Sequence, residues 1–161
     1  MNYIDLGLPS GTLWADRNYG AAGVEHSGKL VSIADLGDKA DLLPTEEQLK
    51  ELLKHCKCDY GGWVGGNCSL DGGTRYDILT GPNGNSIRIQ RCGCIDEKGE
   101  PNWNGFGGDA FWWSKTDAYL YGQKGKVILG LFRFQVPRLS LVRSVLGYKI
   151  SARFVKSLKE N

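Results

Sequence analysis

Apolar and polar residues alternate over short stretches along most of this chain, and long helical repeats are rare. Two such stretches lie in residues 3–15, on either side of Pro9-Ser10-Gly11. Proline, serine and glycine in succession are typical of a β-turn. The segment therefore predicts a short strand, a turn and a second short strand.

The clearest helical pattern begins after Pro44. Thr45 is a favourable N-cap residue, and Gln48 follows three positions later, which completes a capping-box pattern. Apolar residues then recur at helical spacing, at Leu49, Leu52, Leu53 and Cys56. We expect one well-defined helix with a buried stripe, ending near residues 58–62.

The remaining pattern is strand-like and is divided by turns. Residues 81–85, Gly-Pro-Asn-Gly-Asn, favour a tight hairpin between two strands. Residues 16–42 and 96–109 show no regular period. The predicted strands after the helix are residues 75–80, 86–91, 110–114, 119–121, 126–136 and 148–155. One helix with mostly antiparallel strands predicts an α+β fold, formed as a single domain over residues 1–161.

Composition and charge narrow the function classes. Of the 161 residues, 41% are hydrophobic and 24% are charged, and the net charge is only +2, which does not favour nucleic acid as a partner. Basic residues cluster near the C-terminus, where we expect a solvated face. The longest apolar run, residues 127–136, is interrupted by polar residues, so no membrane span is predicted. Residues 1–11 do not resemble a signal peptide, and localisation stays open between cytoplasmic expression and virion or cell-surface display.

Five longer blocks stand out along the chain: YIDLGLPSGTLWADRNYGA (3–21), LLPTEEQLKELLKHC (42–56), YDILTGPNGNSIRI (76–89), FWWSKT with AYLY (111–121), and GYKISARFV (147–155). In this order they resemble the Fibrobacter major paralogous domain family, which has a C-type-lectin-like fold. Two departures from the family pattern are a shorter segment at 21–42 and a longer, unusually apolar segment at 121–147.

This resemblance implies a binding function. Some proteins of the fold are variable proteins of diversity-generating retroelements, in which adenine-targeted mutagenesis diversifies a C-terminal segment that forms the ligand surface. Residues 128–146 contain no Lys, Glu, Asp, Trp or Met, and all except Gln135 are residues that a mutated Asn codon can encode. The alternative is a pair of core strands, because Phe132, Phe134 and Val136 alternate with polar residues.

We therefore expect a ligand-binding module, not an enzyme, that displays a variable surface over residues 121–146. The partner class is a cell-surface protein or glycan, homo-oligomers are possible, and no cofactor or metal is expected. A structural or adhesive domain of a cell-envelope protein is a second interpretation. The expected ligand contacts are Arg133, Gln135, Arg138, Leu139, Leu141 and Arg143.

Other chemistries receive weaker support from the sequence. The chain has five cysteines, so at least one thiol has no cysteine partner within it; they are at positions 56, 58, 68, 92 and 94. Free thiols are favoured over zinc ligation and over disulfides. Zinc is disfavoured because the Cys-x-Cys spacing suits its coordination poorly. Glu100-Pro101-Asn102 matches a calcium-lectin triplet, but the second lectin motif is missing. His26 and His55 show no triad spacing. An enzyme of the formylglycine-generating type, which belongs to the same fold, stays a third interpretation.

Overall fold

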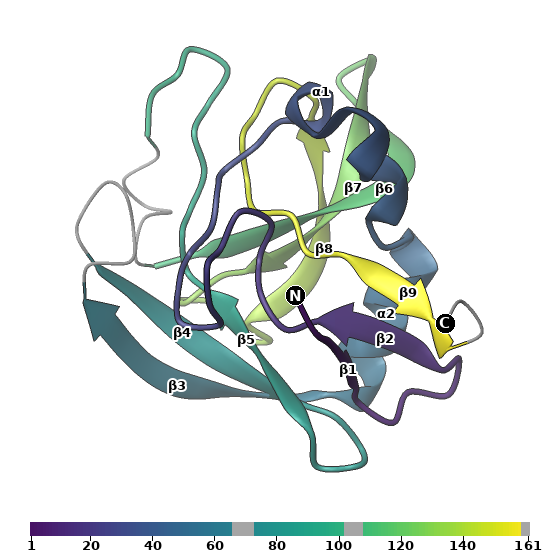
Figure 1. The fold of residues 1–161 in the computed structure, drawn as a ribbon. Coiled ribbons are helices and arrows are strands. Elements are labelled where there is room, and N and C mark those ends of the chain that lie inside the picture. Colours follow the sequence, from purple (N-terminus) through teal and green to yellow (C-terminus); the bar gives the residue numbers. More distant parts are fainter. Residues whose placement is uncertain (66–72, 102–107, 159–161) are drawn as a thin grey trace.

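The computed structural model describes residues 1–65, 73–101 and 108–158, which form a mixed α+β structure with mostly antiparallel strands in three small sheets (Figure 1). The elements in chain order are β1 (Tyr3–Asp5), β2 (Thr12–Ala15), α1 (Ile33–Leu36), the 3-10 helix η1 (Gly37–Leu42), α2 (Glu46–His55), β3 (Lys57–Gly65), β4 (Gly73–Thr80), β5 (Ser86–Gln90), β6 (Ala110–Leu120), β7 (Gln123–Leu131), β8 (Leu139–Val145) and β9 (Val155–Ser157).

The first sheet joins the beginning of the chain to its end. Its strand order is β1-β2-β9, so β2 lies between the first and the last strand, and both pairings are antiparallel (Figure 1). Trp14 on β2 is opposite Val155 on β9, and the Trp14 side chain is fully buried. The two-strand prediction for residues 3–15 is confirmed.

The second sheet has the order β3-β4-β5 and contains the predicted hairpin turn between β4 and β5. Ile87 and Ile89 of β5 are buried, as their alternation predicts. The β3 strand was not expected, because the helix was predicted to continue toward residues 58–62. Strand β3 starts at Lys57 and carries a bulge between Tyr60 and Gly62.

The third sheet has the order β6-β7-β8, with β7 at its centre. The two strands predicted at residues 110–114 and 119–121 belong to one strand, β6, which ends at Leu120 and has a register irregularity between Trp113 and Asp117. Strand β7 ends at Leu131, so residues 132–136 do not continue it. Strand β8 covers part of a region whose mixed apolar and basic residues had not indicated a strand.

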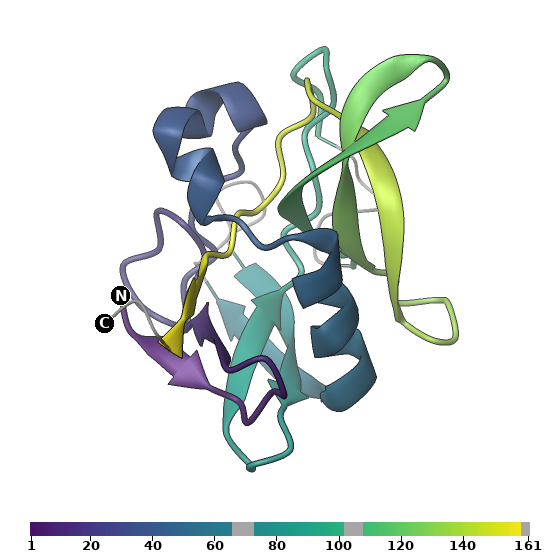
Figure 2. The ribbon, with the colours of Figure 1, turned by 90° about the vertical axis from the view of Figure 1, so that its right-hand side faces the viewer.

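Helix α2 is built as its sequence predicts. The Thr45 hydroxyl accepts from the Gln48 backbone N–H, the Gln48 side chain accepts from the Thr45 backbone N–H, and Leu49 and Leu52 are buried. The helix contacts all three strands of the β6-β7-β8 sheet (Figure 2). Its first backbone amide, of Glu46, donates to the Thr116 hydroxyl on β6 at 2.8 Å.

Two clusters of buried side chains fill the interior on opposite faces of the β6-β7-β8 sheet. The main core contains Trp14, Leu49 and Trp112 and joins α2 to all three sheets. The second cluster contains Trp113 and Phe154 and joins α1 to the irregular C-terminal segment. Residues 33–42 thus form helical turns, where the sequence had indicated irregular structure.

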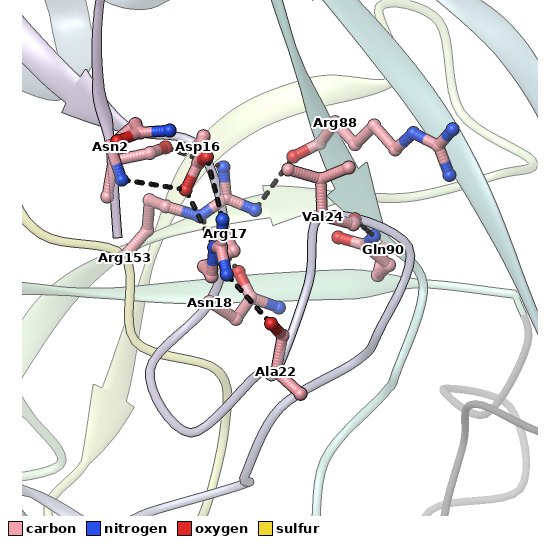
Figure 3. A network of polar contacts seen from close by, with 10 residues as sticks. Asn2, Asp16, Arg17, Asn18, Ala22, Val24, Arg88, Gln90 and Arg153 are labelled. Atoms are coloured by element: carbon pink, nitrogen blue, oxygen red, sulfur yellow. Dashed lines mark hydrogen bonds and ion pairs between the residues drawn. The ribbon is translucent and has the colours of Figure 1, made fainter.

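A buried arginine ties the C-terminal segment to the rest of the chain (Figure 3). Arg153 is fully buried and donates to the Asn18 side chain at 3.0 Å and to the backbone carbonyls of Ala15 and Arg88. Its guanidinium also lies 4.5 Å from the centre of the Trp112 ring. The expectation that the C-terminal basic residues form a solvated face is therefore wrong for Arg153.

No helix among the described residues is long and apolar enough to cross a bilayer.

Candidate functional site

The candidate site is centred on the loop of residues 132–138, which joins β7 to β8 and extends from the end of their sheet (Figure 2). Hydrogen bonds hold its backbone at both ends. The Phe132 N–H donates to the Arg138 carbonyl at 2.7 Å, and the Gln135 N–H donates back to the Phe132 carbonyl at 3.0 Å. The Arg133 N–H donates to the Asp109 carboxylate at 3.1 Å. The loop backbone is therefore fixed by contacts that do not depend on its exposed side chains.

Apolar side chains at the tip of the loop face solvent. Phe134 is 87% exposed and Val136 is 99% exposed, with exposed Gln135 between them. The Arg133 guanidinium lies 4.4 Å from the centre of the Phe134 ring, so a cation covers part of this aromatic surface. Exposed apolar side chains beside arginine match the composition of protein interfaces.

Arg138 fastens the loop to the second sheet. Its Nη2 lies 3.1 Å from the Oδ2 of Asp77, a β4 residue whose side chain is 0% exposed. The same carboxylate accepts from Arg91 through two guanidinium nitrogens and from the Cys58 thiol at 3.4 Å. Two arginines therefore surround one buried carboxylate, and the four side chains carry a net charge of about +1 with the thiol neutral.

A shallow cavity of about 390 Å³ lies beside this ion pair. Its walls are mostly apolar and come from α2, β3, β8 and the loop. The lining residues are Leu53, Cys56, Cys58, Pro137, Arg138 and Leu139. The cavity is therefore next to the exposed tip and is formed by elements of the rigid framework.

The two cysteines of this cavity are poor nucleophiles. Burial raises the pKa of the Cys56 thiol to about 11, with a smaller contribution from the charge of Glu51. Burial, followed by the charge of Asp77, raises the pKa of the Cys58 thiol to about 12. Both groups are protonated at neutral pH, and a protonated thiol is a weak nucleophile and a weak metal ligand.

The six expected contact residues differ in position and in exposure. Three of them belong to the loop: Gln135 is exposed, and Arg133 and Arg138 are half-buried. Leu139 and Leu141 on β8 are half-buried and pack against the main core. These two leucines have a structural role in addition to any contact that they make.

Arg143 lies apart from the loop, further along β8. Its side chain is exposed, and its Nη1 donates to the Tyr119 carbonyl on β6 at 3.1 Å. Ile128, Leu129 and Leu131 are buried. The core-strand interpretation is therefore correct for the β7 part of residues 128–146, and the accessible part begins at residue 132.

Sequence reasoning missed the exposure of Phe134 and Val136 because it assigned them to a strand. Pro137 was the available signal, since proline lacks the N–H that a central strand needs. Asp77 was also missed, and no local pattern identifies it, because its partners come from β3, the residue after β5, and the 132–138 loop.

The described residues give little support to metal binding, calcium-dependent sugar binding or catalysis by histidine. Among the described ranges, no group of three or more His, Cys, Asp or Glu side chains could hold a metal ion. Cys68 and the Asn102 of the calcium-lectin triplet lie outside the described residues. The Nε2 of His26, which is half-buried, lies 3.3 Å from the carboxylate of the exposed Glu25, so His26 lacks the buried partner of a catalytic triad.

Comparisons with protein-family models, curated proteins and solved structures found no match to this chain.

Proposed function

We propose that this chain is a binding module of C-type-lectin-like fold that recognises a partner through the exposed side chains of the 132–138 loop. The first and last strands lie in one sheet, on either side of β2, and this arrangement and the order of the sequence blocks support the fold. A fold alone does not determine function, and the proposed function depends on the side chains of the loop.

One observation carries the proposal: the backbone of the loop is held by hydrogen bonds and an ion pair, and the side chains at its tip do not pack against the rest of the protein. Phe134 and Val136 are almost fully exposed, whereas the loop ends are held by Arg138 on Asp77 and by two backbone hydrogen bonds. Because the loop is ordered before binding, little conformational entropy is lost when a partner docks. Substitutions at the tip then change specificity without changing the framework.

Of the two partner classes, cell-surface protein and glycan, the loop favours a protein. Phenylalanine and arginine are enriched in the centres of protein interfaces, and the adjacent cavity can receive an apolar side chain of the partner. The proposal assigns no catalytic role, and the protonated thiols at Cys56 and Cys58 disfavour a cysteine-based oxidase at this place.

The retroelement origin of the loop is tested by sequencing the genomic DNA on both sides of the coding region. We expect a reverse transcriptase gene and a near-copy of the 3′ end of the coding sequence, with differences confined to adenines of the copy. The codons for residues 132–146 should contain those differences. A flanking region without any such copy contradicts diversification and favours a structural or adhesive envelope domain.

The tolerance of the loop to substitution is tested with two displayed libraries. One library is randomised at Phe134, Gln135 and Val136, and the matched library is randomised at Leu49, Leu52 and Leu129 in the core. Protease resistance should persist across most of the loop library and be lost from most of the core library. Selection of the loop library against purified cell-surface proteins should enrich different sequences for different targets. Equal loss of resistance in both libraries contradicts the proposal.

A further inference from the structure

A second cavity, of about 370 Å³, lies on the outer face of the β3-β4-β5 sheet. Ile78 and Arg88 both line it and are opposite each other in the β4-β5 pairing. Their chain neighbours Leu79 and Ile89 are buried in the main core, so Ile78 and Arg88 face away from that core. The volume is in the range of about 300–1,000 Å³ that is usual for small-molecule sites.

Three aliphatic side chains from distant parts of the sequence form apolar walls of this cavity. They are Ile4 of β1, Val24 of the loop that follows β2, and Ile78 of β4, and each is half-buried. The Gln90 side-chain amide donates to the Val24 carbonyl at 2.6 Å, which holds this loop against β5 (Figure 3). An apolar ligand group of matching size would therefore bury hydrophobic surface on a wall that the fold already holds in place.

The Arg88 guanidinium lines the same cavity without an acidic partner. It lies 4.1 Å from the centre of the Tyr76 ring, and that ring packs against the backbone of Gly61. Its Nη1 is buried, and within the described part of the chain no hydrogen bond or ion pair involves the guanidinium. Removing a cation from water without a counter-charge costs free energy, and a bound anion would reduce that cost.

Two carboxylates on the same side of the molecule already have basic partners. Asp16, which also lines the cavity, accepts hydrogen bonds of 2.9 and 3.0 Å from Arg17, and these lower the pKa of Asp16, so both groups stay charged. Asp59, on the neighbouring strand β3, lies 3.8 Å from Lys57. The Arg88 side chain is directed away from the Asp16–Arg17 pair (Figure 3). Arg88 therefore adds about one positive charge that no carboxylate balances.

We infer that this cavity binds a small carboxylate with an apolar body, such as an aryl or branched alkyl carboxylic acid. The carboxylate pairs with the Arg88 guanidinium, whose planar N–H groups match two carboxylate oxygens. The apolar body packs on Ile4, Val24 and Ile78. An inorganic anion would leave these walls in water, and a neutral hydrocarbon would leave the cation unpaired. The 132–138 loop supplies no lining residue, so this binding is separate from the proposed recognition of a protein partner.

The experiment titrates the protein with 3-phenylpropionate, with its uncharged amide and with acetate, and follows backbone amide signals by NMR. The wild-type protein should bind 3-phenylpropionate with a dissociation constant in the millimolar range or below, and binding should weaken as salt increases. The amide lacks the charge and acetate lacks the apolar body, so each should bind roughly tenfold more weakly or worse. Signals of residues 76–78 and 86–88 should shift, and those of the 132–138 loop should not.

Three variants test the role of the guanidinium. Arg88→Gln should weaken binding of 3-phenylpropionate by roughly tenfold, and Arg88→Lys should have an intermediate effect, because it keeps the charge but loses the two-point pairing. The matched control, Lys124→Gln, removes an exposed positive charge on β7 and should bind like wild type. Thermal unfolding checks that each variant is folded, and Arg88→Lys keeps the test available if Arg88→Gln is not.

Four results would overturn the inference. They are the absence of saturable 3-phenylpropionate binding to the wild-type protein, binding of the amide or of acetate as tight as that of 3-phenylpropionate, wild-type affinity in both folded Arg88 variants, and shifted amide signals that lie away from β4 and β5. None of these results bears on the 132–138 loop, whose proposed function is tested by its own libraries.

Discussion

Asp77 is the residue on which the candidate site depends most. Its carboxylate is buried, and its partners Arg91, Arg138 and Cys58 each come from a different segment. Burial of a carboxylate costs free energy unless cations and hydrogen-bond donors compensate for the lost water. The contacts therefore connect the position of the 132–138 loop to the stability of the fold.

Asp77→Asn should destabilise the protein by about 3–5 kcal/mol, because it leaves two arginines next to a neutral amide. The free energy of unfolding is measured by urea titration. The matched control is Asp117→Asn, which removes exposed ion pairs to Lys124 and Lys126 and should destabilise the protein much less, because solvent screens these pairs. Similar losses in the two variants would show that the Asp77 contacts do not stabilise the fold.

The thiols of Cys56 and Cys58 predict a dependence of stability on alkaline pH. Their pKa values are raised from 9.0 to about 11 and about 12 in the folded protein, so the unfolded chain releases these protons first. Their contribution to stability is complete below pH 9 and declines as the pH rises from 9 toward 11–12.

This dependence is measured as urea midpoints at pH 8, 9 and 10, for wild type and for a variant with Cys56→Ala and Cys58→Ala. The midpoint of wild type should fall more steeply between pH 9 and 10 than that of the variant. Parallel curves would mean that the two thiols ionise alike in the folded and unfolded states.

Among the elements, those whose signals are local follow their sequence. Helix α2 has its cap, its first-turn acids and its apolar stripe within a dozen positions, and the structure reproduces them. Strand β8 was not predictable in this way. Leu139 and Leu141 pack on the main core while Val142 packs on the second cluster, so both faces of the strand are partly apolar and no alternation marks it.

The β3 bulge gives a prediction at the scale of the strand. Gly61→Ala should destabilise the protein by about 1–3 kcal/mol, because the added methyl group must displace the Tyr76 ring. In a Tyr76→Ala background the same glycine replacement should cost much less, which a double-mutant cycle on unfolding free energies measures. An equal cost in both backgrounds would place the strain in the backbone and not in the contact with Tyr76.

For the whole molecule, the sequence predicted the α+β class and the hairpins but not how the three sheets meet. That arrangement depends on long-range contacts such as Arg153 with Asn18 and with the Arg88 carbonyl. A residue type that is usually exposed gives no sign, in its own neighbourhood, that it will be buried by segments far away in the sequence.

The β1-β2-β9 sheet predicts that both ends of the described chain unfold together. Amide protons of β2 and β9 should exchange with solvent at similar rates, close to those set by global unfolding, because Trp14 and Val155 belong to one core. Hydrogen exchange followed by mass spectrometry measures these rates. Much faster exchange in β9 than in β2 would show that the last strand frays independently.

The same sheet also constrains how the protein matures on the ribosome. Strand β2 leaves the exit tunnel before its partner β9, which is translated only after nearly all of the described chain. Until then Trp14 lacks Val155, which lies opposite it and belongs to the same core cluster in the folded protein. The nascent polypeptide therefore exposes hydrophobic surface until β9 has been made. Chaperones that bind such surface would raise the yield of native protein.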